Sequence, residues 1–517
     1  MKKYFLFLLL PLAFLLFFSC EKELPNHLTF DSYEYATSDE TGGDWEPVYL
    51  TGTGLVVIPE PDDITSDNSI NSAQIADLKS FNQALTEEEQ AAVDYWGNNS
   101  IIRWFEITEE LIAKYNLAPS PDENGEYGVP DPVFPETYPT FPFAHPPYAC
   151  RAYAYLGASF YDALITAWHY KYTYNRPAPY IVDNSIVPAY PDNNLPSYPS
   201  EDAVIASVAE ELLIFLFPLE INYIQEQAQE LRDTRIWAGM NVASDIVAGD
   251  SIGKTIAEIF IGRAKTDSMK FAQVEEDEYM EMEEAASLLW GNSWPRWENL
   301  EVPQRPIGIT PKFGHVVPWW IPSVEAVRPG PPPAIGSDEY NSDKNELLDY
   351  ADNLTREQEQ IAYFWGDGFG TYTPAGHWNT IAKEYIVHYR FNPLRTARTY
   401  AYLNTAMMDA GISCWDTKYY YMYPRPPQAD KKIETLFGLP NFPSYTSGHS
   451  TFSAAAAEVL GYVFPNEQSL FEQYAKDASE SRIYARIHFR FDCETGLTVG
   501  ENIGNYAVSA AQADGVD

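Results

Sequence analysis

Cysteine is scarce in this chain, which limits the chemistry that thiols could supply. The 517 residues include four cysteines, Cys20, Cys150, Cys414 and Cys493. None of them has the close spacing of a zinc site. Beyond Cys20 three remain, a number that permits one disulfide and one free thiol, and the sequence leaves the pairing open.

Basic residues are also few, with 33 lysines and arginines against 74 aspartates and glutamates and a net charge of −41. Such a surface repels nucleic acid and anionic lipid, so neither is an expected partner. The densest acidic stretch lies at residues 275–284. We expect a solvated loop or helix face there, with calcium binding as the alternative. A cluster of cations in so acidic a protein therefore indicates a local function.

Long apolar runs are missing except at the N-terminus, where Lys2 and Lys3 precede an apolar run from Tyr4 to Phe18. The run is too short for a comfortable membrane span and has the pattern of an export signal. Cys20 after a small residue resembles a bacterial lipobox, and an ordinary secretory signal is the alternative. We therefore expect an exported bacterial lipoprotein, periplasmic or at the cell surface, anchored through Cys20.

The chain contains two similar halves. R-A-Y-A-Y-L at residues 151–156 returns as R-T-Y-A-Y-L at residues 398–403, and P-S-Y at residues 196–198 returns at residues 443–445. Both pairs share one offset, since 398 − 151 = 247 and 443 − 196 = 247. A constant offset over so long a stretch predicts an internal duplication.

Each half has the pattern of a helical bundle. Apolar residues recur at three- and four-residue spacing in residues 85–96, 151–168 and 203–217. Thr86 with Glu89, and Thr355 with Gln358, have the spacing of capping boxes. We expect an all-α fold of two related antiparallel helical bundles, of which only the C-terminal one carries an intact site. The expected parts are a signal peptide (1–19), an N-terminal extended segment (20–75), a degenerate first bundle (76–270), an acidic and Pro-rich connector (271–343) and a catalytic bundle (344–517).

Three short segments near the C-terminus concentrate the polar chemistry. Written as patterns they are K-x6-R-P from residue 418, S-G-H from residue 447 and S-R-x5-H-x3-D from residue 481. Together they supply three cations, two imidazoles, a hydroxyl and a glycine N–H, which suits a compact oxyanion. Asp492 follows His488 by four residues, so on a helix it could orient that imidazole. Ser447 precedes an apolar run and is expected to start a helix whose N-terminus favours an anion.

The first half provides an internal comparison. Where the second half has Ser447-Gly448-His449, the first has Ser200-Glu201-Asp202, and Asn241 stands in place of His488. Two carboxylates would repel an anionic ligand, and an amide lacks the basicity of an imidazole. The second half is therefore predicted to be the active copy.

These residues resemble the superfamily that unites vanadium-dependent haloperoxidases with type-2 phosphatidic acid phosphatases and bacterial acid phosphatases. The two-bundle length resembles the haloperoxidase branch. The resemblance implies vanadate as cofactor, His488 as the vanadium ligand and His449 as the group that takes a proton from hydrogen peroxide. It implies that halide is oxidised to hypohalous acid or halogenated organics. The implied catalytic residues are His449, His488, Lys418 and Asp492, and the implied anion-binding residues are Lys418, Arg425, Ser447, Gly448, Arg482 and His488.

Further positions follow from the same resemblance. Trp415 and Phe442 match an aromatic pair that lines the halide side of the pocket, although Trp168 at the Trp415 position of the first half allows a core role. Asp367 resembles an acid that pairs with a site arginine. Thr446 precedes S-G-H where the common superfamily signature has proline, a departure that weakens a plain phosphatase assignment.

Two alternatives remain open. The same pocket could bind phosphate and act as a phosphohydrolase through a phosphohistidine at His488. A non-catalytic lipoprotein that binds glycan or nutrient through its many aromatic residues is the other alternative. In the enzyme interpretation the partners are small molecules (hydrogen peroxide, halide and an organic acceptor), membrane contact is limited to the lipid anchor, and a homodimer is left open.

Overall fold

The fold is all-α, as predicted. The computed structural model describes residues 30–52, 56–66, 69–116, 145–291, 296–301 and 308–516, and these contain helices, turns and no strand. The signal peptide and Cys20 lie outside them. No helix among the described residues is both long and apolar enough to cross a bilayer. The helices are α1 (Ser69–Asn82), α2 (Glu87–Trp96), α3 (Ser100–Tyr115), α4 (Pro146–Tyr174), α5 (Pro179–Val182), α6 (Glu201–Leu216), α7 (Ile221–Trp237), α8 (Ala243–Thr266), α9 (Glu276–Trp290), α10 (Val324–Val327), α11 (Asp338–Asn353), α12 (Arg356–Phe364), α13 (Thr373–His388), α14 (Pro393–Tyr421), α15 (Pro426–Ala429), α16 (Gly448–Val463), α17 (Gln468–Tyr484) and α18 (Arg490–Ala511).

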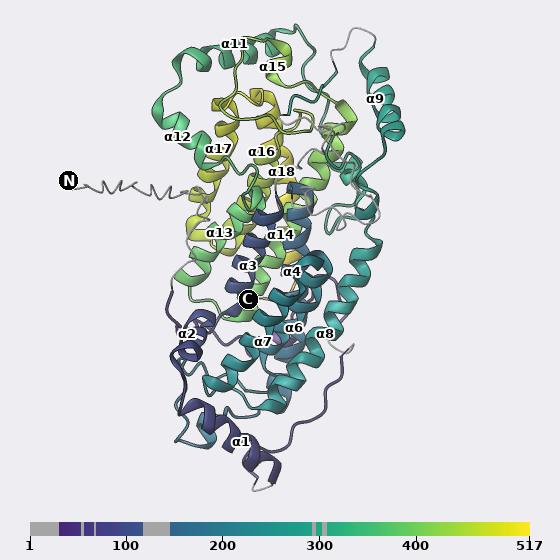
Figure 1. Ribbon diagram of the computed structural model, residues 1–517. Helices are drawn as coiled ribbons and strands as arrows, with labels where there is room; N and C mark the ends of the chain where they lie inside the picture. Colours follow the sequence, from purple (N-terminus) through teal and green to yellow (C-terminus); the bar gives the residue numbers. More distant parts are fainter. Residues whose placement is uncertain are drawn as a thin grey trace, which may run out of the picture.

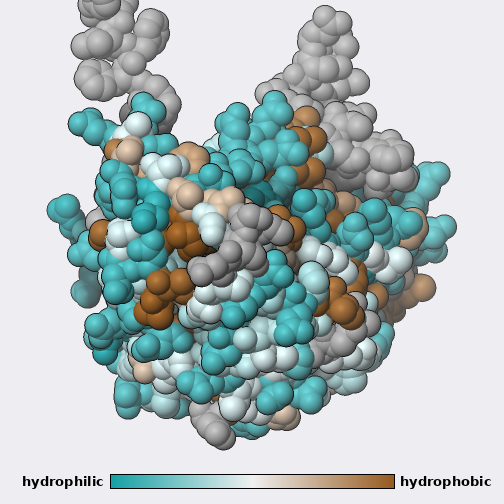
Figure 2. Space-filling view, turned by 90° about the horizontal axis from the view of Figure 1, so that it is seen from below, coloured by the Kyte–Doolittle hydropathy of each residue, from teal (hydrophilic) through white to brown (hydrophobic). Residues whose placement is uncertain are grey.

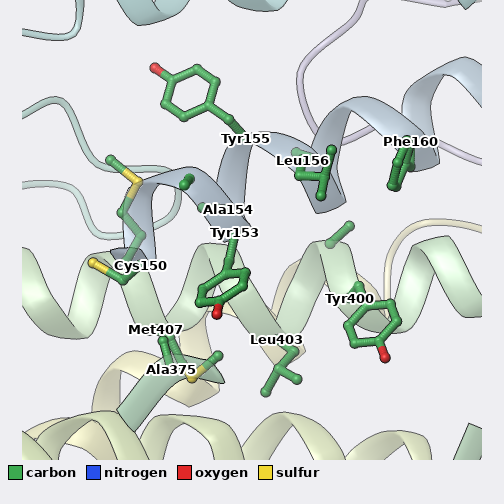
Figure 3. Packing of buried hydrophobic residues seen from close by; sticks show 14 of the residues in the cluster. Cys150, Tyr153, Ala154, Tyr155, Leu156, Phe160, Ala375, Tyr400, Leu403 and Met407 are labelled. Atoms are coloured by element: carbon green, nitrogen blue, oxygen red, sulfur yellow. The ribbon is translucent and has the colours of Figure 1, made fainter. Parts of the chain in front are cut away.

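Helices α4 and α14 form the centre of the molecule and pack against each other (Figure 1). Apolar side chains of both helices belong to one buried cluster, and Tyr153 of α4 points toward α14 (Figure 3). A side chain at Gly157 would come within 2.7 Å of the Tyr400 carbonyl oxygen, so glycine permits this close helix contact. The long buried helices thus hold the two halves together.

The helices of the two halves correspond at the offset seen in the sequence. Adding 247 to the bounds of α4 gives 393–421, which are the bounds of α14, and adding it to those of α6 gives 448–463, which are those of α16. Within each half, α6 packs on α8 and α16 packs on α18. An internal duplication would produce this correspondence, and the duplication itself stays a prediction. Both predicted capping boxes, at Thr86 and Thr355, are present.

Buried carboxylates hold corresponding backbone segments in the two halves. Asp162 on α4 accepts hydrogen bonds from the amides of residues 48–50. Asp409 on α14, at 162 + 247 = 409, accepts them from the amides of residues 319–321. Part of the predicted connector therefore packs on α14 as the N-terminal segment packs on α4, and the domain boundaries within 271–343 remain predictions.

The remaining connector residues include α9, which carries the acidic stretch and also packs on α14. No group of His, Cys, Asp or Glu side chains suited to a metal ion occurs within the described ranges. The acidic residues of α9 mostly face solvent, in agreement with a solvated helix face. The end of the molecule that bears α1 is likewise largely hydrophilic, with its hydrophobic residues in separate patches (Figure 2).

All three described cysteines, Cys150, Cys414 and Cys493, are buried free thiols. The disulfide that the cysteine count permits is therefore not formed among them. Burial raises the pKa of Cys493 to about 12, so this thiol stays protonated at neutral pH.

Candidate oxyanion site

His488 lies at the centre of the three predicted segments. Its Nδ1 is 3.0 Å from Asp492 Oδ2, and its Nε2 is 2.9 Å from Arg425 Nη1. A guanidinium only donates, so Nε2 is the unprotonated nitrogen and Nδ1 carries the hydrogen that Asp492 accepts. The predicted orientation of His488 by Asp492 is therefore present. The unprotonated Nε2 is the atom that could bind an electrophilic centre.

The backbone at His488 differs from the expected single helix. Helix α18 begins at Arg490, so His488 precedes it and Asp492 lies in its first turn. Asp492 Oδ2 also accepts hydrogen bonds from the Phe489 amide and from Ser444 Oγ, at 3.1 and 2.5 Å. This hydrogen bond between the Asp492 carboxylate and the Phe489 amide fixes the start of α18. His488 is thus held from a loop, and Ser444 is a supporting contact that the sequence pattern did not indicate.

Lys418 and Arg425 bring two buried cations to the same place. Lys418 Nζ donates to the carbonyl oxygens of Pro443, Ser444 and Thr446, at 2.5 to 2.9 Å. Arg425 starts α15 and donates to the carbonyls of Phe442 and Ile487. Lys418 Nζ lies 5.1 Å and the Arg425 guanidinium carbon 5.3 Å from the Phe442 ring centre. The segment around Phe442 therefore positions both charges.

Arg482 and the S-G-H segment complete the site. Arg482, near the end of α17, donates to the carbonyls of Ala362 and Trp365. Ser447 is the N-cap of α16 and accepts from the Ser450 amide, as the sequence predicted. A Cβ added at Gly448 would find its nearest atoms 4.0 Å away, on Phe452 and Trp415, so the space beside this backbone is open. A ligand can approach the start of α16 through that space.

Asp367 connects His449 with a histidine that the sequence reasoning missed. Asp367 Oδ1 is 3.1 Å from His377 Nδ1, and Oδ2 is 3.5 Å from His449 Nε2. We expected Asp367 to pair with a site arginine, but the ion pairs of the described residues include none between Asp367 and Arg482. The left-handed backbone at Asp367 (φ 42°) turns the chain before α13, which carries His377. His377 is the fifth residue of α13, ten residues after Asp367, and no local pattern in the sequence pointed to it.

The electrostatics of the site reflect burial that the neighbouring carboxylates Asp492 and Asp367 offset only in part. Burial lowers the pKa of Lys418 to about 7 and those of Arg425 and Arg482 to about 10. Burial, then the neighbouring cations, hold the pKa of His488 well below its usual value. Burial also lowers the pKa of His449 to about 4. Both imidazoles are thus neutral at neutral pH, and the cations are destabilised until an anion joins them.

In the first half, carboxylates pair with the corresponding buried cations. Lys171, the counterpart of Lys418, pairs with Glu201 at 2.7 Å, and Arg235, the counterpart of Arg482, pairs with Asp202 at 2.9 Å. Although burial opposes it, Asp202 raises the pKa of Arg235, whereas the pKa of Arg482 is lowered. Glu201 and Asp202 occupy the positions of Gly448 and His449. The two carboxylates of the first half therefore neutralise its cations from within the chain, and the second half has glycine and histidine at their positions.

The second half also has much more room at the site than the first half. His488, His449, Gly448 and Arg482 line a cavity of about 800 Å³ in the second half. The corresponding place in the first half, lined by Asn241 and Asp202 among others, measures about 30 Å³. Trp415 and Phe442 also line the large cavity, with ring centres 4.8 Å apart. Phe442 is only partly buried and Trp415 is fully buried, hydrogen-bonded to the Ile309 carbonyl.

Comparison with known proteins finds a family match for the C-terminal part of the chain. Residues 399–514 match the PAP2 superfamily. This PAP2 segment contains all three predicted motifs. No curated protein sequence matches the chain closely enough to count as a relative.

Solved structures show the same fold over most of the chain. A bacterial vanadium-dependent iodoperoxidase superposes with a TM-score of 0.56 at 22% identity, covering 79% of this chain and 95% of that one. An apo bacterial vanadium-dependent chloroperoxidase superposes with a TM-score of 0.50 at 13% identity, covering 72% and 95%. At these identities the likeness concerns the fold.

The residues present fit a tetrahedral oxyanion such as vanadate. Three buried cations face the segment around His488 without a carboxylate of their own, apart from the Asp492 that orients the histidine. The His449 Nε2 atom is buried without a hydrogen bond of good geometry. The open space beside Gly448 gives access to the backbone at the start of α16. Lys418, Arg425, Arg482, Ser447 and Gly448 would hold the oxygens, and His488 Nε2 the central atom.

Anion binding should weaken as the pH rises above about 7. In the free protein Lys418 is protonated only below its pKa of about 7, and a bound anion raises that pKa. Above pH 7, anion binding is therefore accompanied by protonation of Lys418. Below pH 7, Lys418 is already protonated and takes up no further proton. Calorimetry with tungstate, a tetrahedral dianion of constant charge over the neutral range, measures both the affinity and the proton uptake. Lys418→Met should bind weakly and take up fewer protons, and an affinity independent of pH in the unaltered protein would contradict the assignment.

Proposed function

We propose that this protein is a vanadate-dependent haloperoxidase that oxidises halide with hydrogen peroxide. The observation that carries the proposal is a set of buried cations whose pKa values burial lowers, around an oriented, neutral histidine and next to an aromatic cavity. The fold shared with structures described as a vanadium-dependent iodoperoxidase and a vanadium-dependent chloroperoxidase supports the choice of vanadate. The Trp415–Phe442 pair supplies an apolar wall on which a weakly hydrated halide could rest.

The residues of the chain have separate tasks in this reaction. Vanadate, when bound, activates peroxide for two-electron oxidation of halide without changing its own oxidation state. Asp492 keeps the proton on His488 Nδ1, so Nε2 faces the ligand as a lone pair. Arg425 gives up its hydrogen bond to Nε2 and donates to the anion instead. The other cations and the start of α16 neutralise the remaining oxygens.

His449 moves the proton. It is neutral at pH 7, because burial lowers its pKa to about 4, and it lines the cavity. A neutral imidazole accepts a proton from incoming hydrogen peroxide. The Asp367 carboxylate beside it then stabilises the imidazolium. Although burial raises it, the two histidines hold the pKa of Asp367 well below its usual value, so Asp367 stays ionised for this task.

A direct assay tests the proposal. Purified protein with orthovanadate, hydrogen peroxide, a halide and a halogen acceptor should form the halogenated product, and no product should form without vanadate. The same preparation is tested with an aryl phosphate. The match of residues 399–514 to the PAP2 superfamily keeps phosphoryl transfer at His488 as the second candidate. Phosphatase activity that vanadate inhibits, without any halogenation, would replace the first proposal by the second.

His377 should control the rate without controlling anion affinity. It contacts Asp367, which in turn faces His449, so it acts through both as a positioning residue. We expect His377→Gln to lower kcat by roughly tenfold or more, as loss of such supporting contacts does in other sites. The tungstate Kd should stay the same. His388→Gln, an exposed histidine of the same helix, is the control, and an equal loss of tungstate affinity in His377→Gln would contradict this role.

Export and lipidation at Cys20 remain part of the proposal, since both concern residues outside those described. An enzyme outside the cytoplasm would meet halide and peroxide directly. Labelling of the expressed protein with a fatty acid, lost in Cys20→Ala, tests the anchor. A homodimer likewise stays a prediction.

A further inference from the structure

The outer part of the large cavity is lined by aromatic side chains that face solvent. Tyr363 and Phe364, at the end of α12, are 56% and 65% exposed. Soluble proteins seldom gather large exposed aromatics at one place unless the surface binds something. The aromatic residues that line this cavity beyond the halide pair are Tyr363, Phe364, Phe369, Tyr372, Phe437 and Phe452.

These aromatics adjoin the groups of the proposed reaction. The Phe437 ring centre is 5.3 Å from the Arg482 guanidinium carbon and 6.1 Å from the Tyr363 ring centre. The Phe364 ring centre is 4.9 Å from that of His377, the partner of Asp367. A molecule resting on these rings would therefore lie beside both Arg482 and the Asp367 group.

The first half differs at Tyr363 and Phe437, although Phe364 corresponds to another aromatic residue, Tyr95 (364 − 269 = 95). In the register where Trp96 corresponds to Trp365 (365 − 96 = 269), the counterpart of Tyr363 is Asp94, an exposed acid of α2. The counterpart of Phe437 at the offset of 247 is Tyr190, a buried residue whose hydroxyl accepts a hydrogen bond from Arg235 at 2.7 Å. The second half thus exchanges a polar surface residue and a hydrogen-bonding hydroxyl for apolar ring surface. This exchange occurs only in the half with the intact site.

We propose that this aromatic surface is the binding site for the organic acceptor, and that the acceptor is an uncharged, electron-rich aromatic ring such as a phenol or an indole. The substrate class rests on the proposed function. Aromatic rings stack on the exposed rings of the cavity mouth. The net charge of −41 disfavours an anionic acceptor. Such an acceptor would also compete with the oxyanion for Arg482. A cavity of about 800 Å³ accommodates a bicyclic molecule.

The acceptor is halogenated in two steps. Peroxide takes two electrons from halide, and with one proton the products are hypohalous acid and water. The ring carbon of the acceptor forms a bond to the halogen of hypohalous acid as the halogen–oxygen bond breaks. The ring then loses its proton, which joins the released hydroxide as water.

The test separates aromatic binding from the chemistry. Calorimetry measures the binding of 2-naphthol to the full chain without vanadate or peroxide, beside its saturated analogue decahydro-2-naphthol. We expect 2-naphthol to bind more tightly, and Tyr363→Asp and Phe364→Ala each to weaken it about five- to tenfold, the size of one aromatic contact. Phe81→Ala, which removes an aromatic that is 47% exposed on α1, should leave the Kd unchanged.

The outcomes bear on the two proposals differently. The proposed acceptor site would be wrong if 2-naphthol and its saturated analogue bound equally tightly. It would also be wrong if both cavity variants bound 2-naphthol with the Kd of Phe81→Ala. In the presence of vanadate, peroxide and bromide, the KM for 2-naphthol should rise in the cavity variants in parallel with the Kd. Specific 2-naphthol binding in a protein without halogenating activity would support the aromatic site and overturn the proposed reaction.

Discussion

The variant His488→Ala should lose peroxide-dependent halogenation by about a thousandfold or more. The imidazole supplies the Nε2 lone pair, and no other described side chain offers a comparable atom at that place. Removal of a group that bonds directly to the reacting centre costs at least as much as loss of a general acid or base, which is about 10² to 10⁴-fold. Initial rates at saturating vanadate measure the loss.

A matched variant in the first half provides the control. Asn241→Ala removes the residue that corresponds to His488, and Asn241 donates to the Ser197 carbonyl at 2.9 Å. This change should leave the rate close to that of the unaltered protein, provided that thermal unfolding shows the fold intact. If Asn241→Ala reduced the rate as strongly as His488→Ala, the assignment of the active half would be wrong.

Substitution of two corresponding arginines, Arg235 and Arg482, should change the stability of the protein by very different amounts. Arg235→Met should destabilise the protein by about 3–5 kcal/mol, because it leaves Asp202 buried without its cation. Arg482→Met should cost far less, since Arg482 is bonded to carbonyls and a hydroxyl and leaves no buried carboxylate unpaired. Urea unfolding of the two variants measures the difference.

Ligand binding should change in the opposite order. Arg482→Met should lose most of its affinity for tungstate, since it removes a charge-assisted hydrogen bond at the anion. Arg235→Met, where folded, should bind tungstate like the unaltered protein. Equal destabilisation by the two substitutions would show that the carboxylates of the first half are not the partners of its buried cations.

Much of this arrangement follows from local patterns. The all-α fold, the capping boxes at Thr86 and Thr355 and the helix start at Ser447 depend on neighbouring residues, so their patterns predicted them. The three motif segments were also expected to meet. The structure places their residues around His488. The expectation rested on charge, because a cluster of cations in so acidic a chain indicates a shared local role.

The contacts that decide the site are long-range, and no local pattern reports them. The sequence suggested that Glu201 and Asp202 would repel an anion, and it did not indicate that they pair with Lys171 and Arg235. Asp367 was expected to pair with a site arginine, and its contacts are with two histidines. Ser444 was not predicted at all, because its link to Asp492 spans 48 residues and depends on the fold of the loop before α16.

The carboxylates of Glu201 and Asp202 behave as a ligand that is covalently part of the protein. Their effective concentration is set by the chain, so the first half is neutralised whatever the surrounding solution contains. In the proposed function the second half depends on free oxyanion instead, so its stability should grow by mass action as that anion becomes available. Where oxyanion is scarce, the region around α16 to α18 should be the first to open on heating, and amide hydrogen exchange there would report the supply of the anion.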